Sequence, residues 1–312
     1  MKIALRISTE TYRGTREAVP RLVELLQTHK VGASFLFSFG PDQTGRAAAH
    51  GFSHEAMRRA NTDTVIERYG FPTLMYGTAL PAPDIGRRCA RIMTETKAAG
   101  FETAVHCWNH HQWQRRIASA NAAWTATEMQ RAHARYKEIF GEGALGHGAV
   151  SWQMNIHALR LTQRLGYRWA SDCRGSHPFV PIWNGEPIHC PQLPTTLPTL
   201  DELLGNDGHT VENVHQHLLK LTAMVLTSER NSGQVFSFNA DHQRLKLDVA
   251  MGNLLSGWAE QGHEICSLGQ LRDDLDFATL PRHELTFSVV PGRAGLLLTQ
   301  GDEFLSSWKD AA

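Results

Sequence analysis

The sequence has no excess of charge of either sign. Its 312 residues include 31 lysines and arginines and 31 aspartates and glutamates, so the formal net charge is zero. Proteins that gather nucleic acid or an anionic membrane over a distance do so through a large positive field, which this balance does not supply. We therefore expect no nucleic-acid partner.

Long apolar runs and a secretory signal are also lacking. No stretch reaches the roughly 18 consecutive apolar residues of a membrane-spanning helix, so any membrane contact is expected to be peripheral. Residues 1–7 lead straight into a strand-like run, without the basic region, long apolar stretch and cleavage site of a signal peptide. These absences predict a cytoplasmic protein.

Paired cysteines are missing as well. The five cysteines are odd in number and none lies in a C-x-x-C pair, which argues against a disulfide framework. Histidine, by contrast, is abundant: the chain has 17, some of them clustered. The clustered histidines are therefore the first candidates for chemistry.

What the sequence does contain is an alternation of short β-branched or aromatic runs with helical patterns, typical of βα units around a parallel sheet. A chain of this length often forms a single α/β barrel, so we predict one domain over residues 1–312. Residues 47–83 are interpreted as an insertion, and the proline-rich residues 173–207 as a long loop that forms a lid or a substrate wall. The predicted strands are 3–7, 33–39, 101–106, 149–152, 167–171, 234–238 and 263–266, with the main helices at 84–99, 125–140, 156–165, 211–226 and 245–261.

Ligand sites in such sheets form at the carboxyl ends of the strands. Polar and charged residues follow the predicted strands at these points, which favours a shared site. They include Ser8, Glu10, His106, His110, Gln153, Asp172 and Asn239.

Glu10, His106 and His110 form a candidate metal site. Two histidines four residues apart share a face if they lie on one helical turn, and with a carboxylate they would bind a divalent cation. This ligand number leaves positions open for water and a carbonyl oxygen, as in catalytic sites. The alternative is that the histidines are ordinary loop residues, which is the commoner role of an isolated H-x-x-x-H.

The other candidates have similarly open interpretations. Asp172 could orient a histidine or an arginine, or cap a loop. Cys173 lacks the sequence signature of a nucleophile and is interpreted as a small buried residue. Trp108 and Trp152 could stack on a sugar, although a tryptophan after a strand more often packs in the core.

Four stretches together resemble the 4-deoxy-4-formamido-L-arabinose-phosphoundecaprenol deformylases, a branch of the polysaccharide deacetylases. They are residues 5–17 (LRISTETYRGTRE), 106–114 (HCWNHHQWQ), 171–175 (SDCRG) and 191–199 (PQLPTTLPT). The likeness extends from residue 1 to about residue 300, in the same order and at similar spacing.

This resemblance implies a distorted (β/α)7 barrel, one divalent metal ion of the Zn, Mn or Co type, and hydrolysis of an N-formyl group on an undecaprenyl-phosphate-linked sugar. The product would be the aminoarabinose destined for lipid A, a modification that reduces the affinity for cationic peptides such as polymyxin. The implied location is cytoplasmic, peripheral to the inner membrane.

The resemblance also assigns roles to residues. Glu10, His106 and His110 would hold the metal, and Ser8, Asp172 and Asn239 would occupy catalytic positions. Substrate contacts would come from Arg13, Trp108, Trp152, Gln153 and Arg174.

Four of the motif positions depart from the family pattern. The family's first motif reads Asp-x-Asp-Thr, in which the first aspartate is the general base and the second a metal ligand, and here those positions are Ser8 and Glu10. Glu10 can still bind a metal through its longer side chain, whereas Ser8 cannot serve as a base near neutral pH without help. The family's late histidine acid is replaced by Asn239, which cannot deliver a proton. Asn109 stands where an aspartate is usual. The alternative function is therefore a weakened or inactive relative, or an engineered sequence on this scaffold, that binds metal and the lipid-linked sugar.

Overall fold

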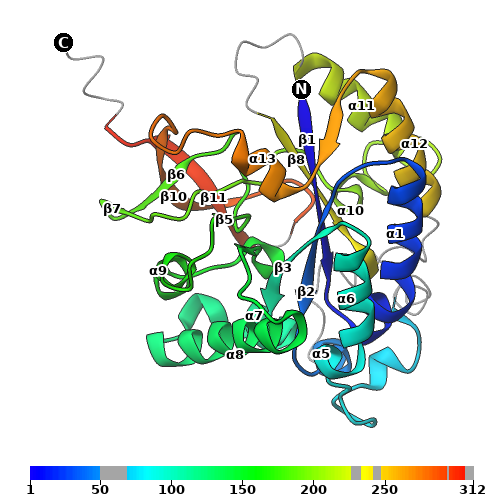
Figure 1. Ribbon diagram of the computed structural model, residues 1–312, viewed down its shortest axis with the longest axis vertical. Helices are drawn as coiled ribbons and strands as arrows, with labels where there is room; N and C mark the ends of the chain where they lie inside the picture. Colours follow the sequence, from blue (N-terminus) through cyan, green and yellow to red (C-terminus); the bar gives the residue numbers. More distant parts are fainter. Residues whose placement is uncertain (50–68, 226–232, 242–246, 294, 306–312) are drawn as a thin grey trace.

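The computed structural model of the chain describes residues 1–49, 69–225, 233–241, 247–293 and 295–305. Its main feature is a seven-stranded parallel sheet in the order β5-β4-β3-β2-β1-β8, with β9 also paired to β1 (Figure 1). The strands are β1 (Lys2–Thr9), β2 (Ser34–Ser38), β3 (Glu102–Cys107), β4 (Gly146–His147), β5 (Trp169–Ala170), β8 (Gln234–Asn239) and β9 (Glu264–Cys266). The predicted α/β class, built on parallel strands, is confirmed.

Strand β1 is the centre of this sheet. One of its edges pairs with β8 from Ile3 to Ser8. The other edge is divided, because Lys2 to Ala4 pair with β9 and Arg6 to Thr9 pair with β2. A strand with three neighbours is buried on every side, which explains the continuous apolar character of its outward residues Ile3, Leu5 and Ile7.

Helices cover the outer face of the sheet and bury these apolar residues. Figure 1 shows α1, α6, α11 and α12 on one side of β1, and α7, α8 and α9 beside the β3 to β5 end. The longer helices are α1 (Val19–Thr28), α6 (Ala90–Ala98), α8 (Ala122–Phe140), α9 (Ile156–Arg164), α11 (Val214–Val225) and α12 (Leu247–Glu260). The shorter ones are η1 (Gly14–Ala18), α2 (Thr44–Ala49), η2 (Thr73–Met75), α5 (Ile85–Arg88), α7 (His110–Arg116), η3 (Ile117–Ser119), η4 (Val150–Trp152), α10 (Leu200–Leu203) and α13 (Leu268–Asp273).

The inner face of the curled sheet changes from apolar to polar along the strands. Near the amino ends the inward side chains form a separate buried cluster of Ala4, Leu36, Ala104, Trp169, Leu193, Val235, Cys266, Leu268 and Leu271. Residues two apart on a strand share a face, so Arg6 and Ser8 follow Ala4 on this side. In the β1–β8 register they lie opposite Ser237 and Asn239. The polar half of the interior is therefore at the carboxyl ends.

Residues 191–197 close the gap between the edge strands β5 and β8. On the β5 side, Ala170 N donates to Pro191 O and Leu193 N donates to Ala170 O, at 2.9 and 2.7 Å. On the β8 side, Thr196 N donates to Val235 O at 3.1 Å, and Val235 N donates to Thr196 Oγ1 at 2.9 Å. This irregular segment completes the barrel where no regular strand does so in the described chain.

A second, four-stranded sheet lies beside the barrel, on the side away from α1 and α12 (Figure 1). Its order is β11-β10-β6-β7, made of β6 (Val180–Trp183), β7 (Glu186–Pro187), β10 (Arg282–Val289) and β11 (Leu296–Glu303). Arg174 fastens it to the barrel, because its amide donates to Leu298 O at 2.9 Å and its carbonyl accepts from Gln300 N at 2.8 Å.

Two sequence-based expectations about elements are wrong. Residues 150–152 form the 3-10 turn η4 and not part of a strand over 149–152, because Ser151 and Trp152 both have a φ of 50°, which no strand accommodates. Residues 173–207 are not devoid of regular elements, since they contain β6, β7 and α10. The predicted insertion at 47–83 is described only in part, and its residues 50–68 lie outside the described chain.

The five cysteines are buried free thiols, and burial raises the pKa of each. The interpretation of Cys173 as a small buried residue fits its complete burial. No helix within the described ranges is long and apolar enough to span a membrane.

Candidate active site

Glu10 is held just after β1 by the carboxylate of Asp241, which lies two residues after the end of β8. Its amide donates to Asp241 Oδ2 at 2.9 Å, and the Thr11 hydroxyl donates to Asp241 Oδ1. A Cβ at Gly14 would lie 1.8 Å from Asp241 Oδ1, so only glycine permits this close approach. Asp42, which follows β2, accepts from Tyr12 N at 2.9 Å and fixes the next turn. Two buried carboxylates thus set the course of the chain around Glu10.

His106 presents a buried lone pair toward Glu10. Its Nδ1 lies 2.5 Å from Gly148 O, and because a carbonyl only accepts, Nδ1 carries the proton. Burial lowers the pKa of His106, which favours the neutral ring. Among the described residues its Nε2 has no hydrogen-bond partner, and it lies 3.8 Å from Glu10 Oε1, beyond hydrogen-bonding distance.

The prediction that His106 and His110 share one helical face is wrong, because the two residues belong to different elements. His106 lies in β3, whereas His110 is the first residue of α7. Asn109 caps that helix, since its Oδ1 accepts from Gln112 N at 2.9 Å. His110 is nonetheless buried, and its Nδ1 has no hydrogen-bond partner.

These donors suit a divalent cation only in part. Within the described chain, no three or more His, Cys, Asp or Glu side chains are grouped so that they could hold a metal ion. Glu10 and His106 are close, and His110 does not complete the set in this conformation. The neutral imidazole lone pairs and the carboxylate are still the chemistry that such a cation prefers, and a ligand in the site would satisfy the two partnerless ring nitrogens.

Ser8 and Asn239 lie directly opposite each other in the β1–β8 register. Asn239 Oδ1 accepts from Asp241 N at 2.9 Å, so the side chain is used in a local turn. Arg6, two residues before Ser8 on the inward face, donates from Nη1 to Ser237 Oγ at 3.0 Å and from Nη2 to Ala149 O at 2.9 Å. Burial lowers the pKa of Arg6 to about 10, so it remains a cation at neutral pH.

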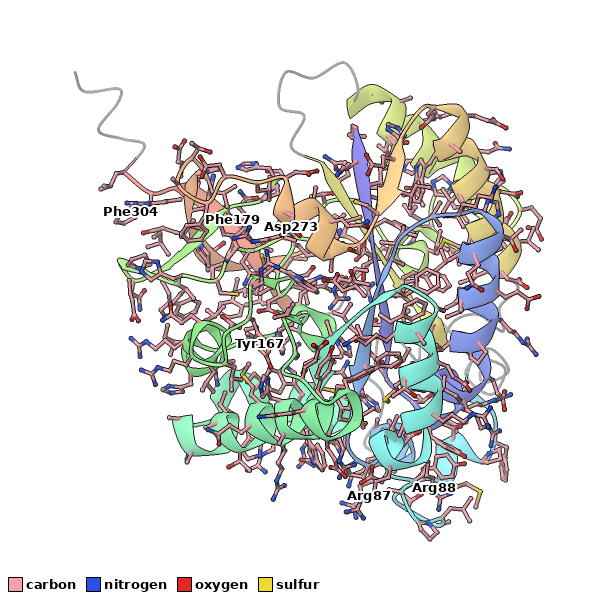
Figure 2. The ribbon with its side chains drawn as sticks, viewed as in Figure 1. Arg87, Arg88, Tyr167, Phe179, Asp273 and Phe304 are labelled. Atoms are coloured by element: carbon pink, nitrogen blue, oxygen red, sulfur yellow. The ribbon has the colours of Figure 1, made fainter. Side chains whose placement is uncertain are left out.

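Asp172 pairs with a histidine that the sequence analysis did not single out. Its Oδ1 accepts from His147 Nδ1 at 2.7 Å and from Ala149 N at 2.8 Å, and both side chains are buried. Tyr167, labelled in Figure 2 on the α8 side of the barrel, stacks on His147 with ring centroids 5.7 Å apart. Asp172 therefore orients a histidine and also fixes the segment that leads from β4 to η4.

The ring of Trp152 is covered by arginines and does not offer an open stacking face. The guanidinium carbons of Arg6, Arg174 and Arg293 lie 5.7, 4.9 and 4.9 Å from its centroid. Its Nε1 donates to Thr195 Oγ1 at 3.0 Å, which ties η4 to the segment that closes the barrel.

The remaining predicted substrate contacts are engaged within the protein. Arg13 Nε donates to Glu17 Oε2 at 3.0 Å. Trp108 carries the Arg135 guanidinium 5.3 Å from its centroid. The carbonyl of Gln153 accepts from Trp113 Nε1 at 2.8 Å, while its own Oε1 is buried and has no hydrogen-bond partner.

Asp42, Asp241, His147 and Arg6 are the residues of this region that sequence reasoning missed. Asp42 and Asp241 each come shortly after a predicted strand, the same signal that identified Asp172 and Asn239. His147 was missed because the strand was predicted at residues 149–152, whereas it lies at Gly146–His147. Arg6 lies inside an apolar run, where an isolated charge is itself an indicator of a buried polar site.

Comparison with known proteins supplies the family. No family model matches the chain. It is 31% identical over 301 residues to the 4-deoxy-4-formamido-L-arabinose-phosphoundecaprenol deformylase ArnD of Shewanella sediminis, covering 96% of this chain and 94% of that protein. It is 26% identical over 290 residues to the ArnD deformylase of Wigglesworthia glossinidia brevipalpis, covering 92% and 98%.

The fold is also that of a solved structure. A polysaccharide deacetylase from Mycobacterium smegmatis superimposes with a TM-score of 0.60 over 92% of this chain and 95% of the other, at 14% identity. This likeness concerns the fold alone, and it agrees with the predicted (β/α)7 barrel. The 31% identity to ArnD over 96% of this chain shows that the chain belongs to the 4-deoxy-4-formamido-L-arabinose-phosphoundecaprenol deformylase family.

Proposed function

We propose that this protein hydrolyses the N-formyl group of undecaprenyl-phosphate-linked 4-deoxy-4-formamido-L-arabinose. Water and the formamide would give formate and the free amine, which serves lipid A modification and resistance to polymyxin. The observation that carries the proposal is the proximity of Glu10 Oε1 and the buried, partnerless Nε2 of His106 at the carboxyl edge of the barrel. The substrate itself is taken from the names of the relatives.

One divalent cation, of the Zn, Mn or Co type, is part of this proposal. Glu10, His106 and His110 would hold it, and when bound it would polarise the formyl carbonyl. The protein's own contribution is to keep His106 neutral through burial, to hold the proton on its Nδ1 through the Gly148 hydrogen bond, and to fix the backbone of Glu10 through Asp241.

The positions of the general base and the general acid are occupied by Ser8 and Asn239, which are poor proton acceptors and donors. The Ser8 hydroxyl and the Asn239 amide can hydrogen-bond to water or substrate, but neither exchanges a proton readily near neutral pH. A general acid or base is typically worth about 10²–10⁴-fold in rate, so turnover is expected to be slow. This observation favours a second candidate function, a relative that binds the lipid-linked sugar with little or no hydrolysis.

We also propose that the protein acts as a single domain in the cytoplasm and meets its substrate at the inner-membrane surface. The lipid-linked substrate supplies the membrane contact in this view. Washing membranes with carbonate should release the protein, and retention after that wash would contradict a peripheral association.

The test measures formate and metal on the same purified chain. With lipid-linked substrate and added metal, the parent should release formate, and Glu10→Gln should lower that release at least about 100-fold, the scale of losing one transition-state contact. Metal content should be close to one ion per chain and fall in a His106→Ala, His110→Ala double variant. The exposed Glu24→Gln is the matched control.

Two outcomes separate the candidate functions. Formate release that is insensitive to Glu10→Gln would contradict this site as the catalytic centre. Tight substrate binding without any formate from the parent would establish the binding relative instead.

A further inference from the structure

Three arginines from distant parts of the chain meet on the ring of Trp152. Arg6 comes from β1, Arg174 follows β5, and Arg293 lies in the turn between β10 and β11. Like charges repel each other, so a fold that gathers three guanidinium groups within 6 Å of one ring centroid needs a compensating anion nearby. We call this set the Trp152 cluster.

Two carboxylates from α10 supply most of the compensation. Glu202 Oε1 bridges Arg174 Nη1 at 2.5 Å and Arg293 Nε at 2.7 Å. Asp201 Oδ2 contacts Arg293 Nη1 at 2.8 Å. Glu202 is fixed, because its Oε2 accepts from Thr199 N in a capping box and its side chain is 3% exposed. Asp201, at 29% exposed, lies at the rim beside Arg293.

The ion pairs of the Trp152 cluster leave one positive charge without a contacting carboxylate. Three guanidinium groups face two contacting carboxylates, and Arg6 forms no ion pair with any carboxylate in the described chain. Asp172 and Glu10 act on Arg6 only from a greater distance. A phosphodiester carries one negative charge, and arginine forks match its oxygens two at a time.

Unused donors and backbone strain point to a ligand at the same place. Arg6 Nε and Arg174 Nε are buried and have no hydrogen-bond partner in the part of the chain that the structure describes. Ser151 and Trp152 both have a φ of 50°, a conformation that is costly for residues other than glycine and that clusters at binding sites. The fold therefore maintains the Trp152 cluster at some expense in stability.

The cluster lies next to the proposed reaction site. Gly148 O holds His106, and the following residue, Ala149, holds Arg6 through its carbonyl. His106 of the proposed reaction site and Arg6 of the Trp152 cluster thus contact adjacent carbonyl groups of one short segment. A sugar that joins a formamide to a phosphate requires two sites arranged as neighbours in this way.

We infer that Arg174 and Arg293 bind the phosphodiester of the lipid-linked sugar, and that Asp201 occupies Arg293 until the ligand displaces it. Glu202 stays in place as the bridge between the two arginines, and Arg6 contributes its charge from 5.7 Å away from the ring centroid. The identity of the ligand rests on the proposed function, whereas the anion site rests on the cluster itself.

Binding of a small charged probe tests the site without catalysis. Titration calorimetry would compare geranyl methyl phosphate, a diester with one negative charge, with its uncharged dimethyl triester. The parent should bind the diester at least about tenfold more tightly than the triester. Arg293→Gln should remove most of that preference, whereas Asp201→Asn, which removes the competing carboxylate, should increase it severalfold.

Controls separate binding from folding. An Asp201→Asn, Arg293→Gln double variant removes one charge of each sign, so the net charge of the cluster does not change, and it should still lack the preference. Arg91→Gln, which removes an exposed arginine paired with Glu95 on α6, should leave it unchanged. Equal binding of the two probes to the parent, or an Asp201→Asn variant that binds the diester less tightly, would overturn the inference.

The two proposals fail in different ways. If the parent prefers the diester but releases no formate, the phosphodiester site stands and deformylation does not. If formate is released while the two probes bind equally, deformylation stands and the phosphate is recognised elsewhere. If the phosphodiester site and the deformylase activity are both confirmed, Arg293→Gln should raise KM for the lipid-linked substrate with little change in kcat.

Discussion

Ser8 lies where a charged side chain would affect both the proposed chemistry and the buried Arg6. Ser8 lies opposite Asn239, on the same inward face as Arg6, and Arg6 has no ion-pair partner in the described chain. A carboxylate at position 8 would therefore supply a base to the site and a counterion to the buried guanidinium. A serine at this position supplies neither group.

Introducing a general base at position 8 and a general acid at position 239 should raise the rate of deformylation. In a Ser8→Asp, Asn239→His double variant we expect formate release to rise by several orders of magnitude, more than with either single change, because base and acid act on one reaction path. Formate per chain would be measured under saturating metal for the parent and the three variants. A parent that already matches the double variant would show that another group is the base, with Asp172 and His111 the first to examine.

The sequence pattern predicts some site residues and not others. Glu10, His106 and Asn239 follow predicted strands, and the barrel brings those strand ends to one edge, so their neighbourhood follows from topology. The contact between Asp241 and the Glu10 amide joins residues 231 positions apart through a turn whose shape depends on Gly14. The Arg293–Trp152 contact depends on a second sheet that docks on the barrel, and no local pattern indicates such docking.

Helix α8 carries a buried acid that the proposed chemistry does not use. Glu128 faces inward, its Oε2 has no hydrogen-bond partner, and burial raises its pKa to about 7 even though Arg131 and Arg116 oppose the shift. A raised acid pKa in the folded state means that the group's contribution to stability is complete below about pH 4.5. That contribution is lost as the pH rises through 7.

Glu128→Gln should therefore stabilise the chain at high pH. The variant cannot ionise, so at pH 8 its free energy of unfolding should exceed that of the parent by roughly 1–2 kcal/mol, with little difference at pH 4. Urea unfolding at pH 4, 6 and 8 measures this, with the exposed Glu24→Gln of α1 as the control. A difference that does not change with pH would mean that the carboxyl is not titrating in the folded state.

Elements with long local patterns are predicted well, and those that depend on distant partners are not. The predicted helix at 156–165 corresponds to α9 (Ile156–Arg164), since a periodic apolar face and the Asn155 cap are both local. Strands β6 and β7 were missed because they are short and pair with each other and with β10, about a hundred residues away. The strand expected at 149–152 is displaced to Gly146–His147, because η4 turns the chain toward Thr195.

At the scale of the whole molecule, the second sheet and the barrel are joined by backbone hydrogen bonds. Arg174 bonds to β11 on both sides of its peptide, and residues 191–197 bond to both β5 and β8. Because the same stretch of chain completes the barrel and leads into the second sheet, we expect the two to unfold together.

Unfolding in urea should accordingly show one transition. Far-ultraviolet circular dichroism and tryptophan fluorescence should give coincident curves, since Trp183 reports on the second sheet and Trp169 and Trp258 on the barrel. An earlier transition that is confined to the Trp183 signal would show that the second sheet is a separate unit and that the single-domain prediction is wrong.

The burial of all five cysteines has a practical consequence. Cys89 precedes α6, Cys107 ends β3, Cys173 follows β5, Cys190 adjoins the segment that closes the barrel, and Cys266 ends β9. A reagent in solution reaches none of them while the fold is intact, so alkylation of each thiol proceeds only as fast as its surroundings open. The alkylation rate of each cysteine thus reports how readily the surrounding region opens. Peptide mapping after a pulse of alkylating reagent would rank the five regions by their opening rates, without any introduced label.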